Sequence, residues 1–179
     1  MSSRTGDPAL HRRTAGTFNW ANALTFVRLC GSVVLFVLIL DAEDTSGTSW
    51  AAAAYGWLLG ATDYYDGKLA RRGRVSRTGA FLDPLADKTV VLGGMTCLVV
   101  VGRYWWVPVA IVAVREIGIT LYRSYWARHG LAIPARRSAK YKTLVQGLAI
   151  FVAVLPPLEH HPLPVAVALW IAVGFTVVS

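Results

Sequence analysis

Apolar residues along this chain are gathered into six long runs, which short polar segments separate. The runs cover residues 22–40, 49–69, 82–102, 104–125, 143–158 and 162–179. Each run approaches the length of about 20 residues that an α-helix needs to cross the hydrocarbon core of a bilayer. The pattern therefore predicts an all-α fold, a polytopic membrane protein built as a bundle of six transmembrane helices.

The composition agrees with a membrane protein. Of the 179 residues, 55% are hydrophobic and 16% are charged, and the mean hydropathy is +0.47. Soluble domains are less apolar, and the length suits a single domain over residues 1–179. The net charge of +8 lies beside the apolar runs, which favours an anionic membrane surface over nucleic acid as the partner. Cys30 and Cys97 lie inside apolar runs, so we expect no disulfide.

The distribution of Lys and Arg orients the predicted helices. Cations are concentrated in the loops at 70–81 and 126–142, whereas the loops at 41–48 and 159–161 contain none. Loops rich in Lys and Arg stay on the cytoplasmic side of a membrane. We therefore expect both basic loops, the polar segment 1–20 and the C-terminus to be cytoplasmic, with the protein in the inner or plasma membrane.

Four aspartates flank the first basic loop. Asp63 and Asp66 are three residues apart and share a face of one predicted helix, and Asp83 and Asp87, four apart, share a face of the next. Antiparallel neighbouring helices can direct all four at one place. Their charges then need protons, Lys or Arg, or metal ions. Oxygen ligands alone suit Mg²⁺ or Mn²⁺, and two such ions roughly 3.5–4 Å apart can clamp a phosphate.

Two small residues continue the face of the first aspartate pair. Gly67 and Ala70 follow Asp63 at i+4 and i+7. They leave space for a flat group, such as a nucleotide base, although small residues also serve the packing of membrane helices. We favour the functional interpretation for Gly67 and leave both open for Ala70. A lone aspartate before proline, such as Asp83, would be a helix cap, but four aspartates in this register point to chemistry.

The segment 63–87 resembles the signature of the CDP-alcohol phosphotransferase family. It reads DYYDGKLAR, then seven residues, then GAFLDPLAD, and every fixed position of the signature is present. The segments NALTFVRL, REIGITLYR and KYKTLVQ are similar to the phosphatidylglycerophosphate synthase branch of that family. In that branch a proline usually follows the asparagine of the first segment, where this chain has Ala23.

The resemblance implies an enzyme that transfers a phosphatidyl group from CDP-diacylglycerol to an alcohol and releases CMP. It also implies six transmembrane helices, a homodimer, and a site at the cytoplasmic interface. Asp63, Asp66 and Asp83 would hold two Mg²⁺ ions, with Mn²⁺ as a substitute, and Asp87 would contribute to the second ion and act as the general base. The residues carried over as contacts of the CDP-lipid are Asn22, Thr25, Gly67, Ala70, Arg71, Ser76 and Gly79.

The branch implies glycerol 3-phosphate as the acceptor, and its phosphate needs cations. The candidates are Arg115, Arg123 and Lys140. The alternative for basic residues here is the orientation of the helices or the binding of anionic lipid headgroups. Inside an apolar run Arg115 needs a partner, and its neighbour Glu116 qualifies only if the helix geometry permits. Arg28 and Lys88 are also candidates to pair with a carboxylate.

Other functions remain open at this point. The same chemistry could use inositol phosphate, serine or another alcohol, including a second lipid. An ion-coupled transporter would carry its ionisable residues near the bilayer midplane, whereas these aspartates are grouped beside basic loops. An intramembrane prenyltransferase would need a longer chain and differently spaced aspartates.

Overall fold

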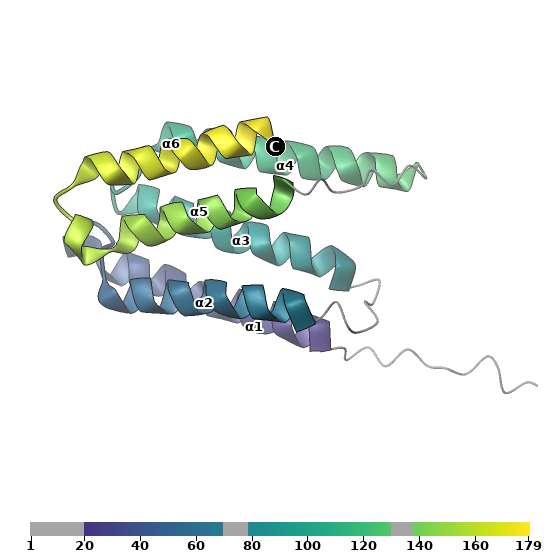
Figure 1. The fold of residues 1–179 in the computed structure, drawn as a ribbon, viewed down its shortest axis with the longest axis horizontal. Coiled ribbons are helices and arrows are strands. Elements are labelled where there is room, and N and C mark those ends of the chain that lie inside the picture. The colour runs from purple at the N-terminus through teal and green to yellow at the C-terminus, as the bar shows by residue number, and fades with distance from the viewer. Residues whose placement is uncertain (1–19, 70–78, 130–137) are drawn as a thin grey trace, which may run out of the picture.

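The computed structural model describes residues 20–69, 79–129 and 138–179, which form helices joined by short turns (Figure 1). These residues contain six α-helices and no strand. Each helix overlaps one of the six apolar runs, which confirms the all-α prediction. They are α1 (Trp20–Asp41), α2 (Trp50–Leu69), α3 (Gly79–Val100), α4 (Trp106–Arg128), α5 (Ser138–Val154) and α6 (Pro162–Val178), with the short 3₁₀ helices η2 (Glu43–Thr45) and η4 (Pro156–Leu158).

The presence of six helices does not by itself show that they cross a membrane. Within the described ranges, none of the helices is both long enough and apolar enough to be assigned as a membrane span. The six-helix architecture is therefore confirmed, and the six transmembrane crossings are not confirmed. The organisation as one domain over residues 1–179 also stays a prediction, and residues 1–19 of its N-terminal segment lie outside the described part.

The helices run alongside one another as an elongated bundle, with α1 and α2 along one edge and α4 and α6 along the other (Figure 1). α5 packs against α6, α3 and α2, and α4 packs against α3 and α6. We expected the consecutive helices α2 and α3 to be direct neighbours. Instead α1 is the main packing partner of both, so the two aspartate-bearing helices are held together largely through α1.

A glycine explains why α1 lies so close to α3. A Cβ atom at Gly93 would lie 2.2 Å from Cζ of Phe36, so a side chain there would collide with the ring. Leu35 and Ile39 flank Phe36 on α1 and are buried in the same apolar cluster as Met95 of α3. The close approach thus lets large side chains of α1 fill the space around the glycine.

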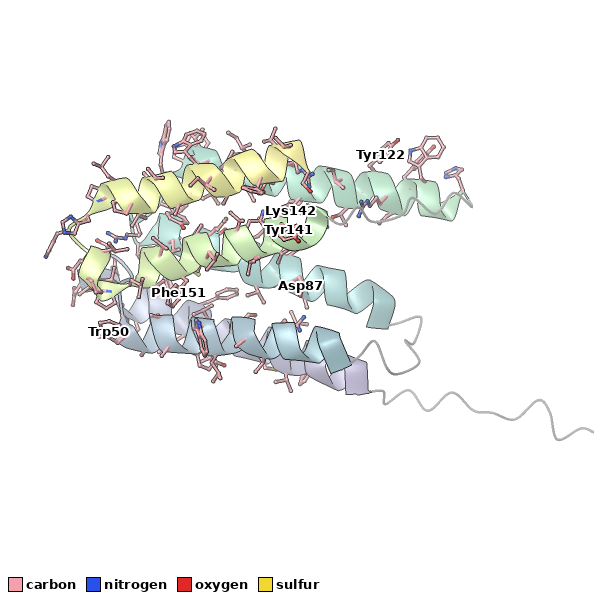
Figure 2. The ribbon with its side chains drawn as sticks, viewed as in Figure 1. Trp50, Asp87, Tyr122, Tyr141, Lys142 and Phe151 are labelled. Atoms are coloured by element: carbon pink, nitrogen blue, oxygen red, sulfur yellow. The ribbon has the colours of Figure 1, made fainter. Side chains whose placement is uncertain are left out.

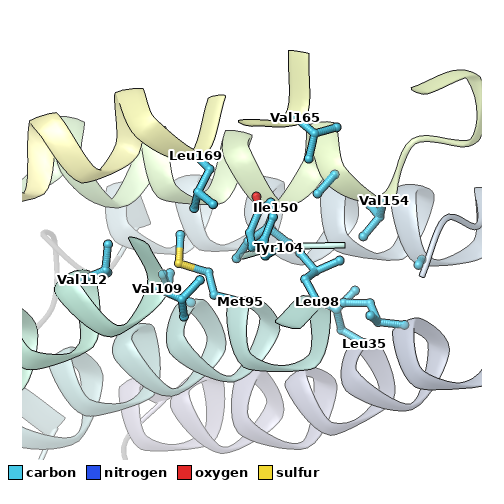
Figure 3. Close-up of a cluster of buried hydrophobic side chains, with 14 of the residues drawn as sticks. Leu35, Met95, Leu98, Tyr104, Val109, Val112, Ile150, Val154, Val165 and Leu169 are labelled. Atoms are coloured by element: carbon cyan, nitrogen blue, oxygen red, sulfur yellow. The ribbon is translucent and has the colours of Figure 1, made fainter. Parts of the chain in front are cut away.

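The apolar core is formed by residues of all six α-helices and lies towards the end of the bundle at which α2 begins (Figures 1 and 3). Each of these helices contributes buried aliphatic side chains, which pack against one another in a single cluster. The buried residues labelled in Figure 3 are Leu35, Met95, Leu98, Tyr104, Val109, Val112, Ile150, Val154, Val165 and Leu169. Since this core occupies one end, the charged side chains described below are placed towards the other.

The turn after α3 is fixed by a Schellman motif. Gly102 adopts a φ of +74°, the left-handed conformation that glycine tolerates best. Its N–H donates to the carbonyl of Val99, and the N–H of Arg103 donates to the carbonyl of Leu98. The motif ends α3 and sets the direction of the following residue.

Arg103 links this turn to the end of α5. Its guanidinium donates hydrogen bonds to three backbone carbonyls, those of Ala153, Leu158 and Glu159. These carbonyls belong to the last turn of α5 and to the end of η4, where helical partners run out, although the carbonyl of Leu158 also accepts from the N–H of His161. Arg103 therefore joins the turn after α3 to the turn after α5.

Candidate active site

The four signature aspartates lie near one end of the bundle. Asp63 and Asp66 are close to the end of α2, and Asp83 and Asp87 are near the start of α3. Figure 1 shows these two helix ends on the same side of the bundle, where α1 also begins. Of the four side chains, that of Asp87 belongs to the described part of the chain. The backbone placement accords with the predicted cluster, and its ligand set stays a prediction.

The predicted contacts of the CDP-lipid fall into two groups. Three of them lie outside the described residues: Ala70, Arg71 and Ser76. The other four have a described backbone on helices at this same end: Asn22 and Thr25 on α1, Gly67 on α2, and Gly79 on α3. Their backbone placement is consistent with one donor site and does not test their roles.

Asp87 is paired with Arg28 of α1. The Nη1 atom of Arg28 lies 2.7 Å from Oδ1 of Asp87, and the two side chains are 13% and 37% exposed. This confirms that Arg28 pairs with a carboxylate. A charge-assisted hydrogen bond of this length restrains the carboxylate, so the segment NALTFVRL contributes to holding an aspartate of the signature in place.

A second charged group surrounds Glu116, which is buried in α4 with 4% of its surface exposed. The Nζ atom of Lys142, from α5, lies 2.5 Å from Oε1 of Glu116. Nη1 of Arg115 lies 3.5 Å from the same oxygen, and Nζ of Lys88 lies 4.0 Å from Oε2. Three helices therefore bring cations to a single carboxylate.

A threonine completes this group. The ammonium of Lys88 donates a hydrogen bond to the hydroxyl of Thr120, and that hydroxyl donates to the backbone carbonyl of Glu116. We call Glu116, Lys88, Arg115, Thr120 and Lys142 the Glu116 cluster. The cluster fixes the side chain of Lys88 against α4 through a second, uncharged contact.

The Glu116 cluster carries more positive than negative charge. Lys88, Arg115 and Lys142 contribute three cations, and Glu116 is their single carboxylate partner among the described side chains, which leaves an excess of two. Lys88 also interacts electrostatically with Arg123, which lies further along α4. Such an excess in a partly buried position is suited to an anion.

Only one of the three predicted acceptor residues belongs to the Glu116 cluster. Arg115 belongs to the cluster and Arg123 lies near enough to act on Lys88, whereas the side chain of Lys140 is not among those described. Lys142, one of the cations of the second basic segment, is buried and paired. Glu116 is the central residue that the site prediction missed. A carboxylate within an apolar run was the signal for it.

A comparison with protein-family models identifies the family to which the chain belongs. The model described as CDP-alcohol phosphatidyltransferase matches residues 18–178. The chain belongs to this family. It contains the signature aspartates, and the family resemblance inferred from them is thereby confirmed.

Curated relatives of this CDP-alcohol phosphatidyltransferase cover most of its length. A probable phosphatidylglycerophosphate synthase of Mycobacterium tuberculosis is 41% identical over 144 residues, which are 77% of this chain and 66% of that protein. The CDP-diacylglycerol–glycerol-3-phosphate 3-phosphatidyltransferase of Bacillus subtilis is 33% identical over 178 residues, 90% of this chain and 91% of its own. The protein of that name in Escherichia coli K12 is 36% identical over 138 residues, 74% of this chain and 75% of its own. The chain thus spans slightly less than two thirds of the mycobacterial relative.

The family consists of membrane enzymes that generally depend on a divalent metal ion. The residues of this chain suit such an ion, because the signature offers carboxylate oxygens, the ligands that hard cations prefer. Asp87 is partly exposed and lies near the start of α3, at the end of the bundle where the four aspartates are placed. Among the described side chains no group of three or more His, Cys, Asp or Glu residues gathers, and of the four aspartates only Asp87 is among them.

Proposed function

We propose that this CDP-alcohol phosphatidyltransferase transfers the phosphatidyl group of CDP-diacylglycerol to glycerol 3-phosphate, forming phosphatidylglycerophosphate and CMP. The names of the Bacillus and Escherichia relatives support this reaction. The observation that carries the proposal is a cation-rich cluster that includes the residue following Asp87 on α3. Lys88 follows Asp87 directly on α3 and belongs to the Glu116 cluster. A phosphate-bearing acceptor bound there would have its hydroxyl within reach of the signature.

The donor side of the proposed site is the group of signature aspartates. Asp63, Asp66, Asp83 and Asp87 would hold two Mg²⁺ ions, with Mn²⁺ as a substitute. When bound, the ions would supply positive charge to the pyrophosphate and to the departing CMP. The proposed contacts of the CDP-lipid are Asn22, Thr25, Gly67, Ala70, Arg71, Ser76 and Gly79.

The acceptor side is proposed to lie among the cations of α3, α4 and α5. Arg115, Arg123 and Lys140, together with Lys88 and Lys142, would bind the phosphate of glycerol 3-phosphate. Asp87 would take the proton of the acceptor hydroxyl as its oxygen bonds to the phosphatidyl phosphorus. The bond from that phosphorus to the oxygen of CMP breaks in the same transfer.

The proposed setting is a membrane that the six helices cross, with the site on the cytoplasmic face and the protein as a homodimer. The helices expose large apolar side chains away from the core, among them Trp57 of α2, Val114 and Leu121 of α4, and Leu163 of α6. Extensive exposed apolar surface is typical of contact with lipid or a partner subunit. Acyl chains of the substrate would then stay in the bilayer while its headgroup enters the site.

The direct test is an assay of CMP release. Purified protein receives Mg²⁺ and CDP-diacylglycerol, and each candidate alcohol is added in turn. We expect release with glycerol 3-phosphate. Release with inositol phosphate and none with glycerol 3-phosphate would replace the acceptor. Failure with every alcohol, combined with ion flux in protein-containing liposomes, would replace the enzyme by a transporter.

A further inference from the structure

We propose that Glu116 is a positioning residue for the acceptor, whose buried carboxylate holds Lys142 and Lys88 where their ammonium groups together receive the acceptor's phosphate. The inference rests on the proposed function and deepens it. A carboxylate would then help to select an acceptor that carries a phosphate. In direct contact the two negative charges would repel each other. Glu116 would act only through the lysines.

The burial of the lysine–glutamate pair is the first support. Lys142 and Glu116 are 8% and 4% exposed, and the atoms Nζ and Oε1 are 2.5 Å apart. A charge so deeply buried is costly unless it is paired. Without Glu116, the ammonium of Lys142 would be buried without a carboxylate, so the side chain would move towards solvent. That movement would take its charge away from the cluster.

The surplus of cations is the second support. Lys142 alone would neutralise Glu116, so a purely structural ion pair needs neither Lys88 nor Arg115. Those two lie 4.0 and 3.5 Å from the carboxylate oxygens, beyond a good hydrogen-bonding distance. Lys88 and Arg115 thus lie near Glu116 without forming a short hydrogen bond to its carboxylate. The excess of two positive charges matches the dianionic phosphate of a phosphomonoester.

The position of Lys88 on α3 is the third support. Its ammonium is directed towards α4 by the hydroxyl of Thr120, whereas the preceding residue, Asp87, pairs with Arg28 on α1. Lys88 and the proposed general base are thus consecutive on α3 and are directed to different helices, so the phosphate and the hydroxyl of one acceptor would be bound on neighbouring faces of α3. Figure 2 shows Asp87 and Lys142 at a similar level along the bundle, well away from Trp50 at the start of α2.

The test is the variant Glu116→Gln, which keeps the shape of the side chain and removes its charge. We expect the KM for glycerol 3-phosphate to rise about tenfold or more, the loss typical of one charge-assisted contact. The KM for CDP-diacylglycerol should stay within about twofold of the wild type, since its proposed contacts lie elsewhere. A fall in the KM for glycerol 3-phosphate would overturn the inference, because it would mean that Glu116 only repels the acceptor.

The matched control is Thr176→Val. Thr176 is fully buried in α6 and accepts a hydrogen bond from Gln146 of α5, one turn beyond Lys142. The variant loses a buried contact of α5, and so some stability, without touching the Glu116 cluster. We expect its KM for glycerol 3-phosphate to match that of the wild type. An equal rise in both variants would reduce Glu116 to a structural residue and overturn the inference.

Two further measurements separate this inference from the proposed function. Inorganic phosphate should raise the melting temperature of the wild type and not that of Glu116→Gln, whether or not turnover occurs. In the double variant with Lys142→Gln, the KM should rise by less than the product of the single effects. Equal stabilisation of both proteins by phosphate, or independent effects on KM, would overturn the inference and leave the assignment of the reaction intact.

If Glu116→Gln does not fold, Glu116→Asp replaces it with the same measurements. It keeps the charge and withdraws it by one methylene, so the same direction of change in KM is expected. A wild type that is stabilised by phosphate but releases no CMP with glycerol 3-phosphate would refute the proposed reaction alone. An unchanged KM for glycerol 3-phosphate in whichever of the two variants folds would refute the positioning role alone.

Discussion

Arg28 of α1 and Asp87 of α3 form an ion pair, with 2.7 Å between Nη1 and Oδ1. The pair lies where α1 packs most extensively, against α3. The next residue of α3, Lys88, is bonded to Thr120 of α4 instead. Asp87 and Lys88 therefore link the signature aspartates to the Glu116 cluster. In the reaction that we propose, the CDP-lipid is bound at the aspartates and the acceptor at the cluster.

The variant Asp87→Asn tests the general base. We expect turnover to fall by about 10²–10⁴-fold, the usual contribution of a positioned base. Binding of the CDP-lipid should be largely kept, because the other three aspartates remain. Single-turnover CMP release and CDP-diacylglycerol binding to the purified variant measure the two effects separately. An active Asp87→Asn enzyme would remove this residue from the role of base.

The variants Arg28→Lys and Arg28→Gln test the pairing of Asp87. The glutamine variant should lose about tenfold in kcat, because the carboxylate is less restrained without a charged donor. The lysine variant keeps the charge but not the fork of the guanidinium, so we expect it to lie between the glutamine variant and the wild type. Steady-state kinetics with saturating substrates measures kcat. Equal kcat in all three proteins would mean that the ion pair serves packing alone.

Removal of divalent ions tests the donor side. Chelation by EDTA should abolish CMP release, and Mg²⁺ or Mn²⁺ should restore it. If two ions are needed, the rate should depend more steeply on free Mg²⁺ than binding of a single ion allows. The initial rate over a series of buffered Mg²⁺ concentrations measures this. Full activity in EDTA would exclude the metal assignment.

The sequence predicted the helices well because their apolar runs are long. It was least accurate at α5, which was expected to begin at residue 143 and begins at Ser138. Because Lys140 and Lys142 are charged, the segment was predicted to be a loop. Lysine is nevertheless a good helix former, and Lys142 is buried in an ion pair with Glu116. The end of α5 before Pro156 follows the ordinary rule that proline interrupts a helix.

The site could be predicted only as far as local spacing reaches. Asp83 and Asp87 share a helix face by their separation of four residues, and that can be read from the sequence. The contact of Glu116 with Lys142 joins two helices across 25 intervening residues. Nothing local specifies that pairing, because it depends on how α4 and α5 are arranged around α3.

The close packing of α1 and α3 gives a prediction about stability. Gly93→Ala would place a Cβ atom 2.2 Å from Cζ of Phe36, so the ring must shift. We expect a loss of about 1–3 kcal/mol, as for other overpacked cores. Gly174→Ala of α6 is the control, since no atom lies within 4 Å of its added Cβ. Thermal unfolding in detergent compares the two variants, and Phe36→Leu combined with Gly93→Ala should recover part of the loss. Equal melting temperatures for the two alanine variants would contradict the packing argument.

Arg103 stabilises the end of the bundle that lies opposite to the signature aspartates. Its guanidinium donates to the carbonyls of Ala153, Leu158 and Glu159, which Arg103→Met would leave without that donor. Because hydrogen bonds to a charged donor contribute more than neutral ones, we expect the free energy of unfolding to fall by about 2–4 kcal/mol. Arg103→Lys should lose less, since an ammonium reaches some of the same carbonyls. The KM values for both substrates should be unchanged in either variant, because the residue is remote from Asp87. Chemical unfolding and steady-state kinetics on the same preparations measure the two effects, and a changed KM with unchanged stability would contradict a purely structural role.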